Sequence, residues 1–206
     1  MSDIGQSKPL RLCIDVNVWV AHVLALRNGW TGTAAQAIVG MVRDMRAGGR
    51  SMQLVVSVEM IATLEGVLER LGVSGASARE FCAAVAGLMK AGPEGLDPYL
   101  LLAGRDQLGM HDREDAGVLA TALAAKADFL ITDNLRDFVT NDGGTFATQA
   151  VWSNGRLRQL FAILHERADG VLVAVAHPVD FLAWVRDGRD LTPAMVAREF
   201  KLNLVP

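Results

Sequence analysis

Short apolar runs rich in β-branched residues alternate along this chain with segments of helical periodicity, and this alternation constrains the fold more than any other feature. Runs of the first kind predict strands within residues 10–20, 53–57, 128–132 and 170–176. Apolar residues spaced three and four apart predict helices within residues 34–46, 57–71, 76–88, 112–126, 157–167 and 178–185. Strands that alternate with helices favour a mostly parallel sheet with helices on both faces. We therefore predict an α/β protein with three α/β/α layers around a central, mostly parallel sheet.

Length and composition favour one globular domain. The chain has 206 residues, which suits one generous domain rather than two large ones. Because 51% of the residues are hydrophobic and 21% are charged, the chain is predicted to fold rather than to be disordered. We expect a flexible N-terminus over residues 1–9, the domain itself over residues 10–186, and a C-terminal extension over residues 187–206 that contains a small helix.

The net charge of −3 gives the chain no overall field that would attract nucleic acid. Any binding of RNA must therefore depend on a local basic face. Arg43, Arg46 and Arg50 form one candidate group, and Arg156 and Arg158 form another. The alternative for each group is a set of solvated surface arginines. Charge alone thus neither supports nor excludes an RNA partner.

The remaining bulk features indicate a reducing compartment. Cys13 and Cys82 are the only cysteines, and Cys13 lies in an apolar run, so both are expected to act as small hydrophobic residues and not as a disulfide framework. The segment Met1–Pro9 is short and polar and lacks the apolar stretch of a secretory signal. No apolar run approaches the roughly 18 to 20 residues that cross a bilayer. We expect a cytoplasmic protein with no membrane segment.

Asp15 is an acid inside a valine-rich apolar run. Burying an ionised carboxylate without a partner costs several kcal/mol, so Asp15 needs a cation or hydrogen-bond donors. One interpretation is a site at the carboxyl end of a parallel strand, where functional groups gather in such sheets. The segment Thr132-Asp133-Asn134 follows another predicted strand and falls at the same kind of position. The other interpretation is that Asp15 simply caps a neighbouring loop.

A second acidic group, formed by Asp112, Glu114 and Asp115, stands at the start of the helix predicted within residues 112–126. Acids in a first helical turn are favoured by the helix dipole whatever their function. Together with Asp15, however, they supply the oxygen ligands that Mg²⁺ and Mn²⁺ prefer. Such an ion can activate water and stabilise charge on a phosphate. The combination predicts a divalent metal site.

Four segments resemble, in order, the motifs of PIN-domain proteins, and in particular the VapC-like toxin ribonucleases. They are LCIDVNVWVAHVL, VVSVEMIATLEGVLER, HDREDAGVLATALAAKADFLIT and ITDNLRDF, and VLVAVAHPVDFLAWV resembles the closing strand and helix. The resemblance covers residues 10–138 and 171–186. It implies a central parallel sheet and Mg²⁺- or Mn²⁺-dependent cleavage of RNA. It also implies a toxin restrained by an antitoxin protein, and a homodimer.

The resemblance assigns roles to the acids of the first and third motifs. Asp15 matches the first metal-binding acid, Asp115 matches the acid of the third motif, and Asp112 matches the frequent acid just before it. Asn17 matches the polar residue that orients the first site. Thr132, at the end of a predicted strand, is expected to position ligands and water.

The second motif departs from the family pattern, because Thr63 stands where the family has glutamate. Glu59 lies four residues earlier and shares the helical face of Thr63, whereas Glu65 lies about 200° round the helix. Glu59 is therefore the better candidate for the missing acid. It could equally be a first-turn acid favoured by the helix dipole.

The fourth motif departs as well, because Asn134 stands at the position of an aspartate, with Asp133 and Asp137 beside it as supporting residues. An amide oxygen can bind a metal or orient its water but brings no negative charge. The leading hypothesis is a metal-dependent endoribonuclease. A catalytically weakened PIN-like module that binds RNA or protein is the second. A phosphatase-type hydrolase with Asp15 as nucleophile is the third, although Asn17 stands where such enzymes carry another aspartate.

Overall fold

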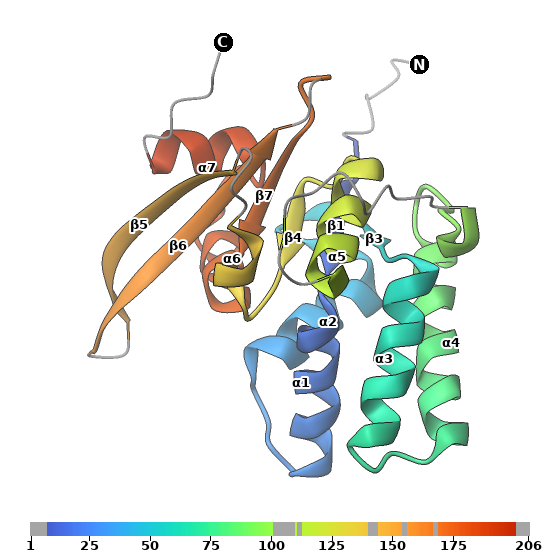
Figure 1. Cartoon of the computed structure of the whole chain (residues 1–206). Helices are drawn as coiled ribbons and strands as arrows, with labels where there is room; N and C mark the ends of the chain where they lie inside the picture. Colours follow the sequence, from blue (N-terminus) through green and yellow to red (C-terminus); the bar gives the residue numbers. More distant parts are fainter. Residues whose placement is uncertain are drawn as a thin grey trace, which may run out of the picture.

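A seven-stranded sheet in the order β2-β3-β1-β4-β7-β6-β5 runs through the molecule (Figure 1). The computed structural model describes residues 8–100, 110, 113–139, 144–153, 156–166 and 169–200. The strands are β1 Leu10–Ile14, β2 Arg46–Ala47, β3 Arg50–Val55, β4 Phe129–Ile131, β5 Gly144–Ser153, β6 Arg156–Glu166 and β7 Leu172–Ala176. The four neighbouring strands β3, β1, β4 and β7 are parallel, and the strands outside them pair antiparallel. The predicted α/β class with a parallel centre is confirmed.

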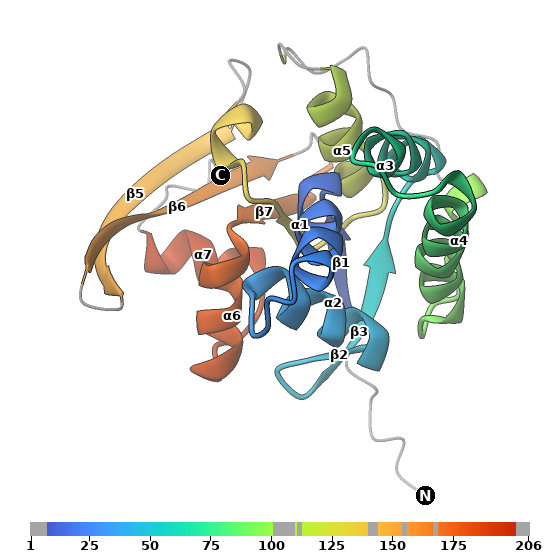
Figure 2. The same cartoon turned by 90° about the horizontal axis from the view of Figure 1, so that it is seen from below.

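Helices cover both faces of this sheet, which gives the predicted three layers (Figures 1 and 2). Helices α3, α4 and α5 pack on one face and α2, α6 and α7 on the other, while α1 lies at the carboxyl edge against α2 and α3. The helices are α1 Val16–Arg27, α2 Ala34–Asp44, α3 Val58–Arg70, α4 Gly75–Ala91, α5 Arg113–Ala124, α6 Pro178–Arg186 and α7 Pro193–Glu199. Short 3-10 turns are η1 Pro98–Leu100 and η3 Leu135–Phe138. Among the described residues, no helix is both long enough and apolar enough to cross a bilayer.

The central strands are mostly apolar because both of their faces are covered. Leu10, Leu12, Cys13 and Ile14 of β1 are fully buried. The register pairs Ile14 with Ile131 of β4, so the two strands end level with each other. Asp15 and Thr132, which follow these two residues, are thereby brought to the same edge of the sheet.

The run over residues 10–20 was expected to be a single strand, and this prediction is wrong beyond Ile14. Val16 already begins α1, and Asp15 is the N-cap residue between strand and helix. Val18, Trp19 and Ala25 of α1 are buried, and further residues of the helix pack against the core, so apolar residues occupy most of its circumference. A helix that is buried on most sides has the same apolar pattern as a buried strand, and periodicity cannot separate the two.

The helix expected within residues 157–167 is also absent, because Arg156–Glu166 is strand β6. Leu157, Leu160, Phe161 and Leu164 follow helical spacing. In the structure residues 156–165 pair with β5 and residues 162–166 pair with β7. Pairing with neighbouring strands outweighs a local periodicity of this kind.

The other expected elements agree with the structure. Ser57 caps α3, because its hydroxyl accepts a 3.3 Å hydrogen bond from the N–H of Met60. Thr33 and Gln36 form a reciprocal capping box at the start of α2. The small helix expected in the C-terminal extension is α7, which begins at Pro193 after the N-cap Thr192.

Candidate active site

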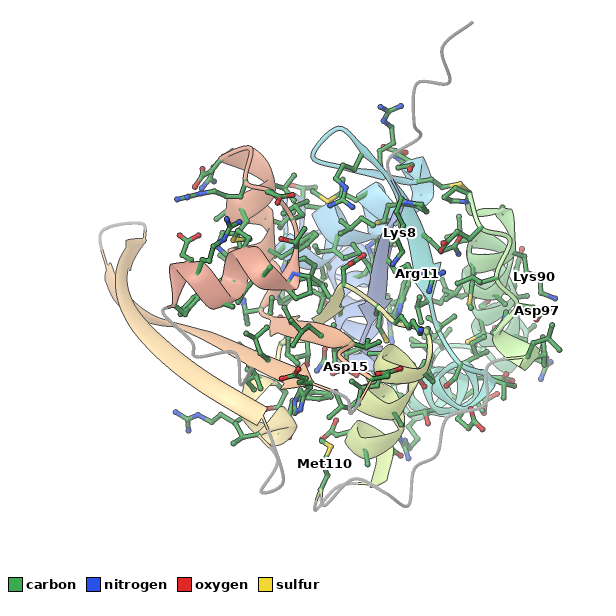
Figure 3. The ribbon with its side chains drawn as sticks, turned by 90° about the horizontal axis from the view of Figure 1, so that it is seen from above. Lys8, Arg11, Asp15, Lys90, Asp97 and Met110 are labelled. Carbon is green, nitrogen blue, oxygen red and sulfur yellow. The ribbon has the colours of Figure 1, made fainter. Side chains whose placement is uncertain are left out.

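A cavity of about 420 Å³ opens at the carboxyl edge of the sheet, between α1, α3, α5 and η3. Figure 3 shows Asp15 in the middle of the molecule beside α5, with Lys8 and Arg11 toward the other end of β1. The cavity is lined by Asp15, Val16, Asn17, Val20, Glu59, Met60, Thr63, Val67, Glu114, Asp115, Gly117, Val118, Asn134 and Asp137. Five of these described side chains are carboxylates and none is a lysine or an arginine. The cavity therefore has the charge that suits a cation.

Asp15 is only 4% exposed, and two neutral side chains hold its carboxylate. The Thr132 hydroxyl and the Asn17 amide both donate hydrogen bonds to Asp15 Oδ2, each 2.7 Å long. Asn17 Nδ2 also donates to the Thr132 oxygen at 2.9 Å, so the three side chains form a closed triangle. Burial raises the pKa of Asp15, and the bond from Thr132 acts in the opposite direction.

The segment after β4 continues this network. The N–H of Asn134 donates to the Thr132 hydroxyl at 3.0 Å, and the N–H of Asp133 donates to Asn17 Oδ1 at 3.2 Å. The Asn134 amide donates to the Asp137 carboxylate, and both residues line the cavity. The Asp133 side chain, by contrast, is not among those that line it. Its carboxylate lies 3.4 Å from Nε2 of His177, which follows β7.

Helix α3 contributes Glu59 and Thr63 to the cavity, four residues apart on one face. Glu65, on the same helix, is not one of the lining residues. This arrangement agrees with the geometric preference for Glu59 over Glu65. Whether the Glu59 carboxylate takes the role of the family's glutamate remains a prediction.

Helix α5 contributes Glu114 and Asp115 from its first turn. Asp115 was predicted to be a site residue, whereas Glu114 was seen only as part of the acidic cluster. The sequence feature that could have identified Glu114 as a lining residue is its position directly before Asp115. Asp112, the third acid assigned to the metal, lies outside the described residues.

The donor set of the cavity fits a hard divalent cation in a hydrated site. Every polar side chain in the described lining is a carboxylate, amide or hydroxyl group, whose oxygens Mg²⁺ and Mn²⁺ prefer. Across the described part of the chain, no three histidine, cysteine or acidic side chains form a ready-made metal cluster. Magnesium keeps several waters and often needs only one or two carboxylates, so such a cluster is not required.

A parallel sheet with carboxylates collected at its carboxyl edge is the arrangement of a nuclease-type α/β/α domain. Comparison with protein families gives the same result, because a PIN-domain model matches residues 11–136, more than half of the chain. The chain belongs to the PIN-domain family, whose members are generally metal-dependent nucleases. Comparisons with curated proteins and with solved structures find no match.

Proposed function

We propose that this PIN-domain protein is an endoribonuclease that depends on Mg²⁺ or Mn²⁺. The observation that carries the proposal is the convergence of Asp15, Glu59, Asp115 and Asp137 from four separate elements on one cavity. Because like charges repel, a collection of carboxylates around a buried Asp15 favours the binding of a cation in the cavity. The helix dipole favours Glu59 and Asp115 in their own first turns, but it does not account for the convergence of all four acids on one cavity.

Within this proposal, Asp15 and Asp115 would hold the ion, together with Asp112. When bound, such an ion lowers the pKa of a water molecule and offsets negative charge on the phosphate under attack. Glu59 and Asn134 would supplement the ligand set. The hydrogen bonds from Thr132 and Asn17 hold the Asp15 carboxylate in a single orientation, so that it needs no rearrangement to bind.

The physiological role implied by the motifs is that of the toxin of a toxin–antitoxin pair. In that role the protein would act in the cytoplasm as a homodimer and be restrained by an antitoxin protein. Support for this finer proposal comes from the motif resemblance alone. Co-expression with the product of a neighbouring small gene, scored by rescue of growth, tests it.

The decisive experiment is cleavage of an end-labelled mixed RNA pool with magnesium, manganese or chelator. Wild type is compared with Asp15→Asn and with Asp97→Asn as a matched control, since Asp97 is an acid far from Asp15 (Figure 3). We expect cleavage by wild type and by Asp97→Asn with metal, and none by Asp15→Asn. Activity that survives in chelator, or in Asp15→Asn, would overturn the proposal.

A second candidate, a PIN-like module that binds RNA without cutting it, is favoured by one observation. The Asn134 amide donates a hydrogen bond to the Asp137 carboxylate, so these two lining residues contact each other. Calorimetric titration with Mn²⁺ separates the two candidates. Binding that is lost in Asp15→Asn favours the nuclease, and no detectable binding favours the module.

A further inference from the structure

The β5–β6 ribbon extends past the edge of the sheet at which the candidate site lies. The register pairs Ala162 of β6 with Ala176, the last residue of β7. Residues 156–161 of β6 therefore lie beyond the carboxyl edge, where they pair only with residues 148–153 of β5 among the described strands. Six residues of a strand at about 3.4 Å each make a projection of roughly 20 Å. Figure 1 shows the ribbon curving away from the sheet on the side to which α1 also projects.

The base of this ribbon is attached to the candidate site. His165 of β6 is buried, and its Nε2 lies 2.9 Å from the carbonyl oxygen of Phe138, the last residue of η3. The same turn carries Asp137, which lines the cavity, and Arg136, which is exposed. A strand of RNA that leaves the cavity over η3 would therefore meet the ribbon next.

The cavity cannot bind the RNA backbone by charge on its own, because its described lining holds five carboxylates and no basic side chain. Positive charge must come from elsewhere. Arg50 is unsuitable, because it is at the amino end of β3 and its guanidinium donates to the carbonyl oxygens of Leu191 and Lys8. Arg43 and Arg46 belong to the same remote end of the sheet.

The distal ribbon carries the other basic pair of the sequence. Arg156 pairs with Ser153 and Arg158 pairs with Val151, so both arginines belong to the end of the ribbon. They occupy alternate positions of strand β6. The PIN-domain match ends at residue 136, so this ribbon lies outside the part of the chain that the family defines.

We propose that the distal ribbon, residues 148–153 and 156–161, binds the sugar-phosphate backbone of the single-stranded RNA that occupies the active site. Arg156 and Arg158 supply its phosphate contacts, and Arg136 continues the basic track toward the cavity. This inference rests on the proposed function for the identity of the substrate, but RNA binding can be measured without cleavage.

The test measures binding of a fluorescein-labelled single-stranded RNA by anisotropy, in chelator, over a series of salt concentrations. Arg156→Ala/Arg158→Ala is compared with wild type and with Arg43→Ala/Arg46→Ala, a matched pair of arginines at the other edge of the sheet. We expect the ribbon variant to bind roughly tenfold more weakly, with the slope of log K against log salt reduced by about 1.4, the value for two phosphate contacts on a single strand. The control pair should leave both quantities unchanged.

Arg156→Lys/Arg158→Lys controls for a folding artefact, because this variant keeps both positive charges. The lysine variant should retain most of the salt dependence of RNA binding. An equal loss in the lysine and alanine variants, or no loss in either, would overturn the inference. So would a change in sedimentation of the alanine variant with no change in RNA affinity, because the ribbon would then join two copies of the chain. RNA that is bound through these arginines but never cut would refute the nuclease and leave the inference standing.

Discussion

The Thr132 hydroxyl donates a 2.7 Å hydrogen bond to Asp15 Oδ2 across 117 positions of the chain. The bond joins the ends of β4 and β1, two neighbouring parallel strands that end level with each other. Thr132 also accepts hydrogen bonds from the Asn17 amide and from the N–H of Asn134. One fully buried hydroxyl thus positions three residues of the candidate site.

Thr132→Val keeps the shape of this side chain and removes its hydrogen bonds. We expect the free energy of unfolding to fall by about 1–3 kcal/mol, because buried partners are left unsatisfied. The pKa of Asp15 should rise further, since the Thr132 bond is the largest of the contacts that lower it. Urea denaturation measures the first effect, and the acidic limb of the pH–activity profile, which should move to higher pH, measures the second. Thr121→Val is the control, because Thr121 is a buried threonine of α5 that donates to the carbonyl oxygen of Gly117 and is not among the residues that line the cavity. An unshifted acidic limb in Thr132→Val would contradict the role of this hydroxyl.

Asp15→Asn is expected to stabilise the metal-free protein at neutral pH. Burial raises the pKa of Asp15, so the folded state binds its proton more tightly than the unfolded state does. Stability from this group is therefore present at low pH and is lost as pH rises through the folded pKa. Asp15→Asn removes the charge and so restores the stability that wild type loses at neutral pH. Each 1 kcal/mol gained in the free energy of unfolding corresponds to roughly 2–4 °C in melting temperature. Thermal melts at pH 7.5 with and without Mn²⁺ test this: metal should raise the melting temperature of wild type and not of the variant. A variant that melts lower than wild type in chelator would show that the Asp15 charge is already compensated.

Much of this architecture could be predicted from the sequence, because local patterns determine it. The sequence predicts that polar and acidic residues of separate motifs lie at one edge of a parallel sheet, since strands that alternate with helices present their carboxyl ends together. The helical geometry of Glu59 and Thr63 was equally local. The triangle of Asp15, Asn17 and Thr132 depends on the register of β1 against β4, and nothing in either segment encodes that register by itself.

The two wrong predictions of secondary structure have a common physical cause. Burial and strand pairing, rather than local spacing, determine the conformation of residues 16–20 and 157–166. The sequence likewise does not predict the contact between His165 and the Phe138 carbonyl, since this contact depends on β6 being a strand. Contacts between segments that are distant in sequence decide these features, and one sequence read alone does not contain them.

His165 predicts a loss of stability on mild acidification. Burial lowers its pKa below the ordinary histidine value of about 6.5, so the unfolded state binds the proton more readily. The stability that depends on a neutral His165 is present above the unfolded pKa and is lost as pH falls toward the folded pKa. We expect the urea midpoint to drop between pH 7.5 and pH 5.5, and His165→Gln, which keeps a donor for the Phe138 carbonyl, to reduce that drop. His177→Gln is the comparison, because His177 is less buried. An equal drop in wild type and in His165→Gln would rule out His165 as the source.

Glu59 provides the sharpest test of how the second motif departs from the family. Glu59 and Thr63 line the cavity, whereas Glu65, on the same helix, does not. If the Glu59 carboxylate supplements the metal site, Glu59→Gln should lower RNA cleavage or Mn²⁺ affinity by about 10–100-fold. Glu65→Gln makes the same chemical change on α3 and should leave both quantities near wild type. Thr63→Glu adds a carboxylate at the family's own position and should restore activity to Glu59→Gln, because the two residues share one helical face. Equal activity in Glu59→Gln, Glu65→Gln and wild type would mean that the site works without a carboxylate from α3, and that α3 contributes only shape.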